Sequence, residues 1–323
     1  MGTDAAVAAI RARDLEALRA AVKGVPSARA MLAAGGAAWL TGLQWLHSRG
    51  GDLNAMYRGY RPLHSLIQED APPASEKAPA ERMACLEWML ANSADPELLG
   101  AWPAARALPV AAFMGCTEYV EKLQAAGAAM DDFVAACLGD LRRVRTVLAK
   151  RPGFATERDR NGMTALQYAA GSRIEQEKCC EIARLLVVAG ADPGVTVQSW
   201  RHQVGALYFA GSSKSACVFE LLLTRGANPH QALTIAMWNG NQELVDLAML
   251  HGAVPDKATA DGQPLLNHLI RWGRIEQALW LLGQGANPNI PDAKGWTAVD
   301  QAKSRGNARM LKAVMAAGGR RIK

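Results

Sequence analysis

The chain has 323 residues, half of them apolar and only 6% aromatic, and its 36 basic and 30 acidic residues give a net charge of +6. Because basic and acidic residues are interleaved, the composition does not favour a nucleic-acid-binding protein. The beginning of the chain carries charges at Asp4, Arg11 and Arg13, where a secretory leader would need an uninterrupted apolar stretch. With no apolar stretch of membrane-spanning length, we expect a cytoplasmic protein without membrane insertion.

Short helices separated by breaks begin at the N-terminus. The stretch 4–25 predicts two helices with a break at Arg13 and Asp14. A further pair follows and ends near Gly50. We interpret residues 1–54 as imperfect capping repeats, because a terminal repeat must leave one face polar.

The middle of the chain, residues 55–158, predicts more helices of the same length. The stretch 69–80 contains three prolines and predicts an extended loop inserted between two helices. After Gly127 only about four residues precede the next helix, which is too few for a projecting hairpin. The helices predicted in this part are 62–68, 81–91, 107–114, 118–126, 131–138 and 140–150.

The C-terminal part, residues 159–323, shows a regular repeat. The last repeat predicts a turn at 291–295 and helices at 297–303 and 308–317. Such short helices cannot bury their apolar faces alone, so they need copies of themselves on either side. Glycines that close the second helix recur every 33 residues, at Gly252, Gly285 and Gly318.

Two connections in this part depart from the regular length. The connection 193–205 is longer than the others, and we expect it to form an extended finger. Between Gly226 and the helix expected at Gln231 there is almost no room, so a finger is predicted to be missing there.

These residues resemble the ankyrin-repeat family, whose unit runs D-x-x-G-x-T-P-L-H-x-A-A before a glycine turn and a helix that ends in L-L-x-x-G-A-D. The resemblance covers nearly the whole chain. It implies an all-α ankyrin-repeat solenoid of about ten helix-turn-helix units with short hairpin fingers, in a single domain over residues 1–323. The matching residues are Asp292, Gly295 and Thr297, then Arg61 to His64, Asn161 to Leu166 with Ala169 and Ala170, and Leu185 and Leu186 before Gly190.

Catalytic and metal-binding motifs are absent from the sequence. It has no Walker loop, G-x-G-x-x-G, G-x-S-x-G or H-E-x-x-H motif. The six cysteines form no C-x-x-C pair and no cluster at zinc spacing, so we interpret them as small core residues in a reducing compartment. The resemblance implies that His64 is structural and bonds to the adjacent turn. We therefore expect no enzyme activity, no catalytic residue, no metal and no cofactor.

The family places turn tips, and the residues just before the inter-helix glycine, on one concave face. In this chain, those positions of the repeat hold large aromatic residues and arginines, the residue types that contribute most to binding energy at interfaces. Phe113, Met114 and Trp238 could instead pack against a neighbouring finger or fill the space left where a finger is missing. Trp45, Trp88 and Trp280 stand at one equivalent position in their repeats, before the end of the second helix, and we assign them to the core. The candidate partner-binding residues are Tyr57, Arg58, Tyr60, Trp102, Trp200, Arg201, His202, Trp238, Asn239, Arg271, Trp272, Lys294 and Trp296.

The favoured function is a non-catalytic module, monomeric, that binds another protein through this concave face. It could act as an adaptor, as an inhibitor or as the neutralising partner of a toxin. The alternative is a binder of nucleic acid or anionic lipid headgroups that uses the surplus of basic charge. Salt separates the two, because binding dominated by phosphate weakens steeply with ionic strength.

Overall fold

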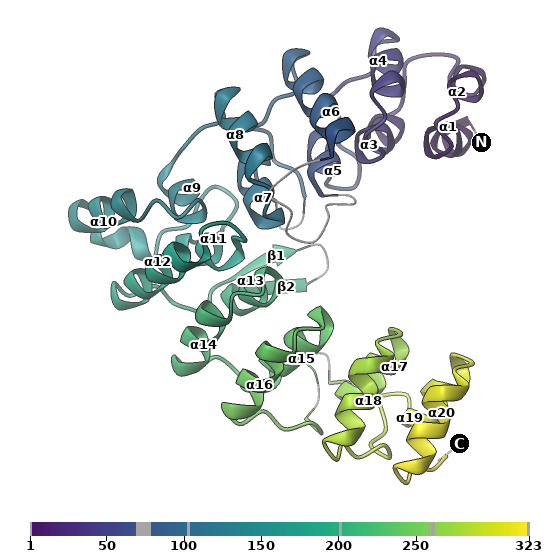
Figure 1. Ribbon diagram of the computed structural model, residues 1–323, viewed down its shortest axis with the longest axis vertical. Helices are drawn as coiled ribbons and strands as arrows, with labels where there is room; N and C mark the ends of the chain where they lie inside the picture. The colour runs from purple at the N-terminus through teal and green to yellow at the C-terminus, as the bar shows by residue number, and fades with distance from the viewer. Residues whose placement is uncertain are drawn as a thin grey trace. The chain divides into compact units, whose positions relative to one another are not determined.

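The computed structural model describes residues 2–68, 79–101, 104–199, 202–257, 259 and 262–321. The chain divides into two compact units, Met1–Phe209 and Ala210–Lys323. Each unit consists of stacked helix pairs (Figure 1), which confirms the predicted all-α repeat fold. Of the predicted loop at 69–80, residues 69–78 lie outside the described part of the chain. The single domain with boundaries after residues 54 and 158 stays a prediction.

In the first unit the helices form two rows. The first helices of successive pairs pack on one another in the order α1, α3, α5, α7, α9 and α11, and the second helices α2, α4, α6 and α8 form another row. The bounds are α1 (Gly2–Arg11), α2 (Leu15–Ala21), α3 (Ala28–Gly36), α4 (Leu40–Ser48), α5 (Pro62–Gln68), α6 (Ala80–Ala91), α7 (Ala107–Met114), α8 (Thr117–Ala125), α9 (Asp132–Cys137), α10 (Leu141–Lys150), the 3-10 helix η1 (Pro152–Ala155), α11 (Ala165–Gly171) and α12 (Gln176–Val188).

The predicted long connection at 193–205 contains a two-stranded antiparallel hairpin. Strand β1 (Thr196–Ser199) pairs with β2 (His202–Gly205), with Thr196 opposite Gly205 and Ser199 opposite His202. Helix α13 (Ala206–Ser213) follows directly. The sequence predicted the extra length of this connection and the structure shows the strands that it forms.

The second unit continues the same arrangement. Helix α17 packs on α19, while α14 packs on α16 and α18 packs on α20. Asn228 caps α15, which begins at the next residue, so the predicted absence of a finger after Gly226 is confirmed. The bounds are α14 (Ala216–Thr224), α15 (Pro229–Asn239), α16 (Gln242–Leu250), α17 (Leu265–Arg271), α18 (Ile275–Gly283), α19 (Ala298–Ser304) and α20 (Ala308–Ala316).

The turn before α19 is held by a buried carboxylate. Asp292 Oδ1 accepts hydrogen bonds from the backbone N–H groups of Lys294 and Trp296, both at 2.9 Å. Its Oδ2 accepts from Gln301 Nε2 at 2.9 Å. In the first unit, Asp159 bonds to the turn before α11 in the same way. The Asp of the repeat pattern is therefore structural in both places, because it satisfies donors that would otherwise be buried without partners.

His64 links two neighbouring repeats, as expected from its position in the pattern. Its Nε2 lies 3.0 Å from the carbonyl oxygen of Ala105 and donates to it. The ring is fully buried, and burial lowers the pKa of His64 to about 4. A Cβ atom on Gly100 would lie 2.6 Å from Cγ of the ring, so the turn can approach the histidine only because this residue is glycine.

Several side chains are less buried than the sequence predicted. Trp45, Trp88 and Trp280 are half-buried and do not belong to the core. Trp88 meets the His47 ring edge-on, with ring centroids 5.6 Å apart. Each of these three tryptophans therefore stays partly in contact with solvent.

The cysteines confirm the sequence interpretation only in part. Cys180 and Cys217 each take part in a disulfide bond, so the interpretation as reduced core residues is wrong for these two. Burial raises the pKa of the Cys85 thiol to about 11, which keeps it unreactive. The buried free thiols are Cys85, Cys116, Cys137 and Cys179.

Candidate functional site

The first helices of the second unit, α15, α17 and α19, end in the same way. Each is followed by a glycine in the left-handed conformation, with φ of 61° at Gly240, 72° at Gly273 and 64° at Gly306. The two residues before each glycine therefore occupy equivalent positions at the helix end. These pairs are Trp238 and Asn239, Arg271 and Trp272, and Ser304 and Arg305.

Four of the side chains near these helix ends form what we name the aromatic cluster: Trp238, His268, Trp272 and Arg274. The Trp238 and Trp272 rings meet edge to face, with centroids 5.8 Å apart and planes at 81°. His268 lies on α17, one turn before Trp272, and its ring centroid is 6.0 Å from that of Trp238. The guanidinium of Arg274 lies 4.9 Å from the centroid of the Trp238 ring, in cation–π geometry.

The two tryptophans of the aromatic cluster are exposed. Trp238 is 37% exposed and Trp272 is 56% exposed. Large apolar side chains in contact at a surface are typical of binding sites, because burial of such rings by a partner stabilises a complex. Their mutual contact also restricts their rotamers before any partner arrives, which lowers the entropic cost of binding.

Beside the aromatic cluster lies a small open depression, which we name the cationic pocket. It has a volume of about 180 Å³ and is formed by α17, α19 and the turn before α19. Asn267 on α17 donates to the carbonyl oxygen of Trp296 at 2.9 Å and so ties this helix to the turn. The pocket is lined by Arg271, Asp292, Lys294, Trp296, Gln301, Ser304 and Arg305.

Helix α17 contributes to both features. Arg271 lines the cationic pocket, and its neighbours His268 and Trp272 belong to the aromatic cluster. Since positions three and four apart on a helix lie on neighbouring surfaces, the last turn of α17 presents an arginine and two rings together. The site therefore combines apolar rings with positive charge over a short distance.

Five predicted partner-binding residues are brought together in this site. Trp238 and Trp272 belong to the aromatic cluster, while Arg271, Lys294 and Trp296 line the cationic pocket. Asn239 lies beside Trp238, but its side chain donates to the carbonyl oxygen of Ile235 at 2.9 Å. Asn239 is thus engaged by its own helix.

The other predicted site residues lie in the first unit. Tyr57 and Tyr60 form an isolated β-bridge at a turn tip, and the Arg58 guanidinium lies 5.3 Å from the centroid of the Tyr57 ring. His202 is exposed on β2. The predicted residues Trp102, Trp200 and Arg201 lie outside the described residues.

Phe113 packs inside the first unit. Its ring stacks on Tyr168 with centroids 6.1 Å apart, and it lies 5.9 Å from the ring of Phe209. Phe113 therefore packs against side chains of α11 and α13.

Six residues of the site were not among the predicted partner-binding residues: His268, Arg274, Asp292, Gln301, Ser304 and Arg305. Arg305 precedes Gly306 just as Trp272 precedes Gly273, so the register used for the other residues would have found it. The roles of His268 and Arg274 depend on the distance between α15 and α17, about which the sequence carries no comparable signal.

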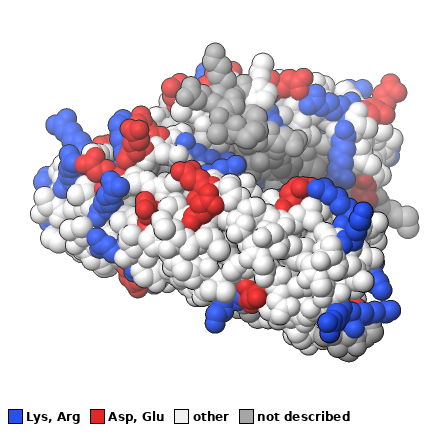
Figure 2. Space-filling view, turned by 60° about the horizontal axis from the view of Figure 1, so that its bottom comes forward, with Lys and Arg blue, Asp and Glu red and all other residues white. Residues whose placement is uncertain are grey.

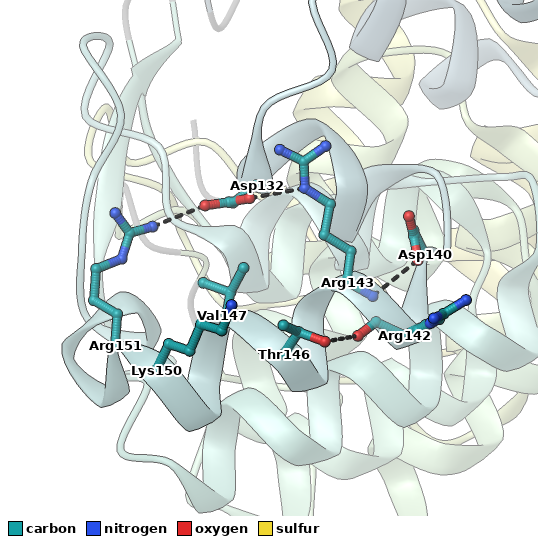
Figure 3. Close-up of a pocket in the computed structure, with 8 residues that line it drawn as sticks. All are labelled: Asp132, Asp140, Arg142, Arg143, Thr146, Val147, Lys150 and Arg151. Atoms are coloured by element: carbon teal, nitrogen blue, oxygen red, sulfur yellow. Dashed lines mark hydrogen bonds and ion pairs between the residues drawn. The ribbon is translucent and has the colours of Figure 1, made fainter.

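The larger depression beside α9 and α10 is a weaker candidate. Figure 3 shows Asp132 between two arginines, with Oδ1 accepting from Arg143 Nε at 2.8 Å and Oδ2 from Arg151 Nη2 at 2.9 Å. Asp140 accepts from the backbone N–H of Arg143 and caps α10. The carboxylates of α9 and its following turn neutralise part of the basic charge, and the residues that line this depression include no aromatic side chain.

Within the described residues, no group of three or more His, Cys, Asp or Glu side chains is placed to hold a metal ion. None of the described helices is both long enough and apolar enough to cross a membrane. On the face drawn in Figure 2, basic side chains lie beside acidic ones in most places, without a continuous basic stripe.

Comparison with known proteins gives matches of limited extent. Among curated proteins, the chain is 42% identical over 86 residues to dynein axonemal heavy chain 12 of Bos taurus, an alignment that covers 24% of this chain and 23% of that protein. The matched stretch is thus about a quarter of the length of this relative.

Two solved structures resemble the chain over more than half its length. An ankyrin repeat domain from Acinetobacter baumannii is 26% identical, with coverage of 58% of this chain and 97% of that one and a TM-score of 0.47. The second is a chain in the complex of a predatory endopeptidase with an immunity protein from Bdellovibrio bacteriovorus. It is 24% identical, with coverage of 57% of this chain and 96% of that one and a TM-score of 0.45.

Two family models match segments that the structure shows as helix pairs. The model described as "Ankyrin repeat" matches residues 161–197, and the model described as "Ankyrin repeats (many copies)" matches residues 268–314. The second segment contains most of the candidate site. Ankyrin repeats are protein-interaction modules. With two matched segments and the same helix pairs stacked through both units, the chain is an ankyrin-repeat protein.

Proposed function

We propose that this protein is a non-catalytic module that binds another protein through the aromatic cluster and the cationic pocket of its second unit. The observation that carries the proposal is the exposed pair Trp238 and Trp272, whose rings contact each other outside the core. Tryptophan and arginine are the residues most enriched among those that dominate binding energy at interfaces.

The geometry also fits a docking surface and not a deep ligand site. The cationic pocket, at about 180 Å³, is smaller than the volumes of about 300 to 1,000 Å³ that are usual for small-molecule sites. A partner would place one side chain in this pocket and cover the aromatic cluster with apolar groups. The proposal covers adaptor, inhibitor and toxin-neutralising roles, and we propose that the module acts as a monomer in the cytoplasm.

Replacing Trp272 with Ala is expected to weaken binding of the partner by about tenfold or more, because it removes an exposed ring at the centre of the site. Thermal stability should change little, since this side chain is 56% exposed. The partner is isolated from the host by capture on the full chain, and its affinity is then measured with purified proteins by calorimetry.

The matched control is Met315→Ala. Met315 lies in the same unit and is 55% exposed, but it belongs to α20 and lies outside the site. This variant should bind the partner as tightly as the wild-type chain. If both variants lose the same affinity, or if Trp272→Ala binds normally, the proposed surface is wrong.

A further inference from the structure

The positive charge of the chain is concentrated in the second unit. Residues 210–323 contain 13 of the 36 basic residues and 8 of the 30 acidic residues, and thus carry +5 of the net charge of +6. The first unit is therefore close to neutral, with 23 basic and 22 acidic residues. The charge surplus is located in the unit that carries the aromatic cluster.

Three acidic side chains of the second unit, one of which lines the cationic pocket, are already engaged by the fold. Asp292 accepts three hydrogen bonds within its turn and from Gln301. Asp300 caps α19 by accepting from both the backbone N–H and the hydroxyl of Thr297 at 3.0 Å. Glu276 pairs with Arg309 through contacts of 2.6 and 3.2 Å. These carboxylates are therefore committed to contacts other than the arginines of the pocket.

The two arginines of the pocket are available to a partner. The side chains of Arg271, Lys294 and Arg305 are exposed and line one depression. Within the described residues, the guanidinium groups of Arg271 and Arg305 have no hydrogen-bond or ion-pair partner. A guanidinium presents paired N–H donors that match a carboxylate bidentately, and the Ser304 hydroxyl in the same pocket adds a further donor.

We infer that the segment bound by this site is an acidic stretch of a partner protein, with a carboxylate in the cationic pocket and an apolar side chain on the aromatic cluster. This inference rests on the proposed function and adds the chemistry of the partner. Charge complementarity selects the occupant, since Arg271 and Arg305 line one depression whose lining carboxylate, Asp292, is engaged by its own turn and by Gln301. A nucleic acid would instead require basic residues that follow a backbone over many nucleotides.

Selection from a random library tests the inference without knowledge of the natural partner. A library of displayed 12-residue peptides is selected on the full chain and, in parallel, on the double variant Arg271→Gln, Arg305→Gln. Peptides selected on the wild-type chain should be enriched in Asp and Glu relative to the unselected library. The double variant should lose this enrichment. Failure to select peptides, or selection without acidic enrichment, would overturn the inference.

Two further measurements sharpen the result. In a selected peptide, replacing every Glu and Asp by Gln and Asn should weaken binding by about tenfold or more, and binding should weaken as salt increases. The control Lys312→Gln, Arg320→Gln removes the same charge from exposed positions of the second unit outside the pocket and should keep most of the affinity. If this control loses as much as the pocket variant, general attraction and not the pocket binds the peptide, and the inference fails.

The outcomes separate the inference from the proposed function. If Trp272→Ala abolishes capture of the natural partner while Arg271→Gln, Arg305→Gln does not, the docking surface stands and the acidic partner segment is wrong. An oligothymidine of 12 nucleotides serves as a competitor. If it displaces the selected peptides at lower concentrations than the peptides themselves, the pocket recognises phosphate, and both proposals give way to a nucleic-acid binder.

Discussion

Replacing Arg82 with Met is expected to lower the free energy of unfolding of the first unit by about 3 kcal/mol. Arg82 is only 6% exposed. Its guanidinium donates to the carbonyl oxygens of Gly36, at 2.9 Å, and of Leu66. These carbonyls belong to the last turns of α3 and α5, where the helix leaves them without partners. Each hydrogen bond from a charged donor contributes about 1.5 to 3 kcal/mol, and methionine keeps the apolar stem but supplies no donor.

The measurement is urea denaturation followed by circular dichroism. The control is Arg142→Met on α10, an exposed position where the same change should alter stability by about 0.5 kcal/mol or less. A destabilisation of Arg82→Met no larger than that of the control would show that the two helix ends do not depend on this side chain.

Helix positions could be predicted because their signals are local. The predicted helices 62–68 and 107–114 agree with α5 and α7. Helix α7 ends at Gly115 because this residue has φ of 80°, a conformation that glycine favours and that stops a helix. Proline, glycine and capping residues act within a few positions of where they stand, so a single sequence is sufficient to locate them.

Contacts between helices could not be predicted in the same way. Arg82 looks like any other arginine of an amphipathic helix, yet it joins α3 and α5 across 46 and 16 positions of the chain. The half-exposure of Trp88, and the disulfide state of Cys180, also depend on neighbours that are distant in sequence. The burial of a side chain depends on the neighbouring helices that pack on it. The apolar periodicity of the sequence indicates only which face of a helix is covered.

The candidate site was predictable to the extent that it follows the repeat. Trp238 and Trp272 were found because both stand just before a glycine that ends a first helix. The cation–π contact from Arg274 to Trp238 joins residues 36 positions apart, and no register relates them. The position of a residue in the repeat therefore indicates which side chains reach the predicted binding face. The structure is needed to show which of these side chains contact one another.

The stability of the first unit is expected to fall between pH 6.5 and pH 4 because of His64. Burial, with a smaller contribution from the charge of Arg61, lowers the pKa of this histidine from an ordinary value of 6.5 to about 4 in the folded chain. Between these values the unfolded chain binds a proton that the folded chain does not bind, so acid favours unfolding. The full difference corresponds to about 3 kcal/mol, of which about 2 kcal/mol is lost between pH 7 and pH 5. Above pH 6.5 this contribution to stability is complete and constant.

The variant His64→Gln isolates the effect, because glutamine can donate to the carbonyl oxygen of Ala105 but does not titrate in this range. Urea denaturation of both proteins at pH 7 and pH 5 gives the loss of stability for each. The wild-type chain should lose about 2 kcal/mol more than the variant, whatever the variant's stability at pH 7. Carboxylates contribute equally to both proteins, so they cancel in the comparison. Equal losses would mean that the ring is protonated as readily in the folded chain as in the unfolded one, and that the buried contact between His64 and the turn at Gly100 opens in solution.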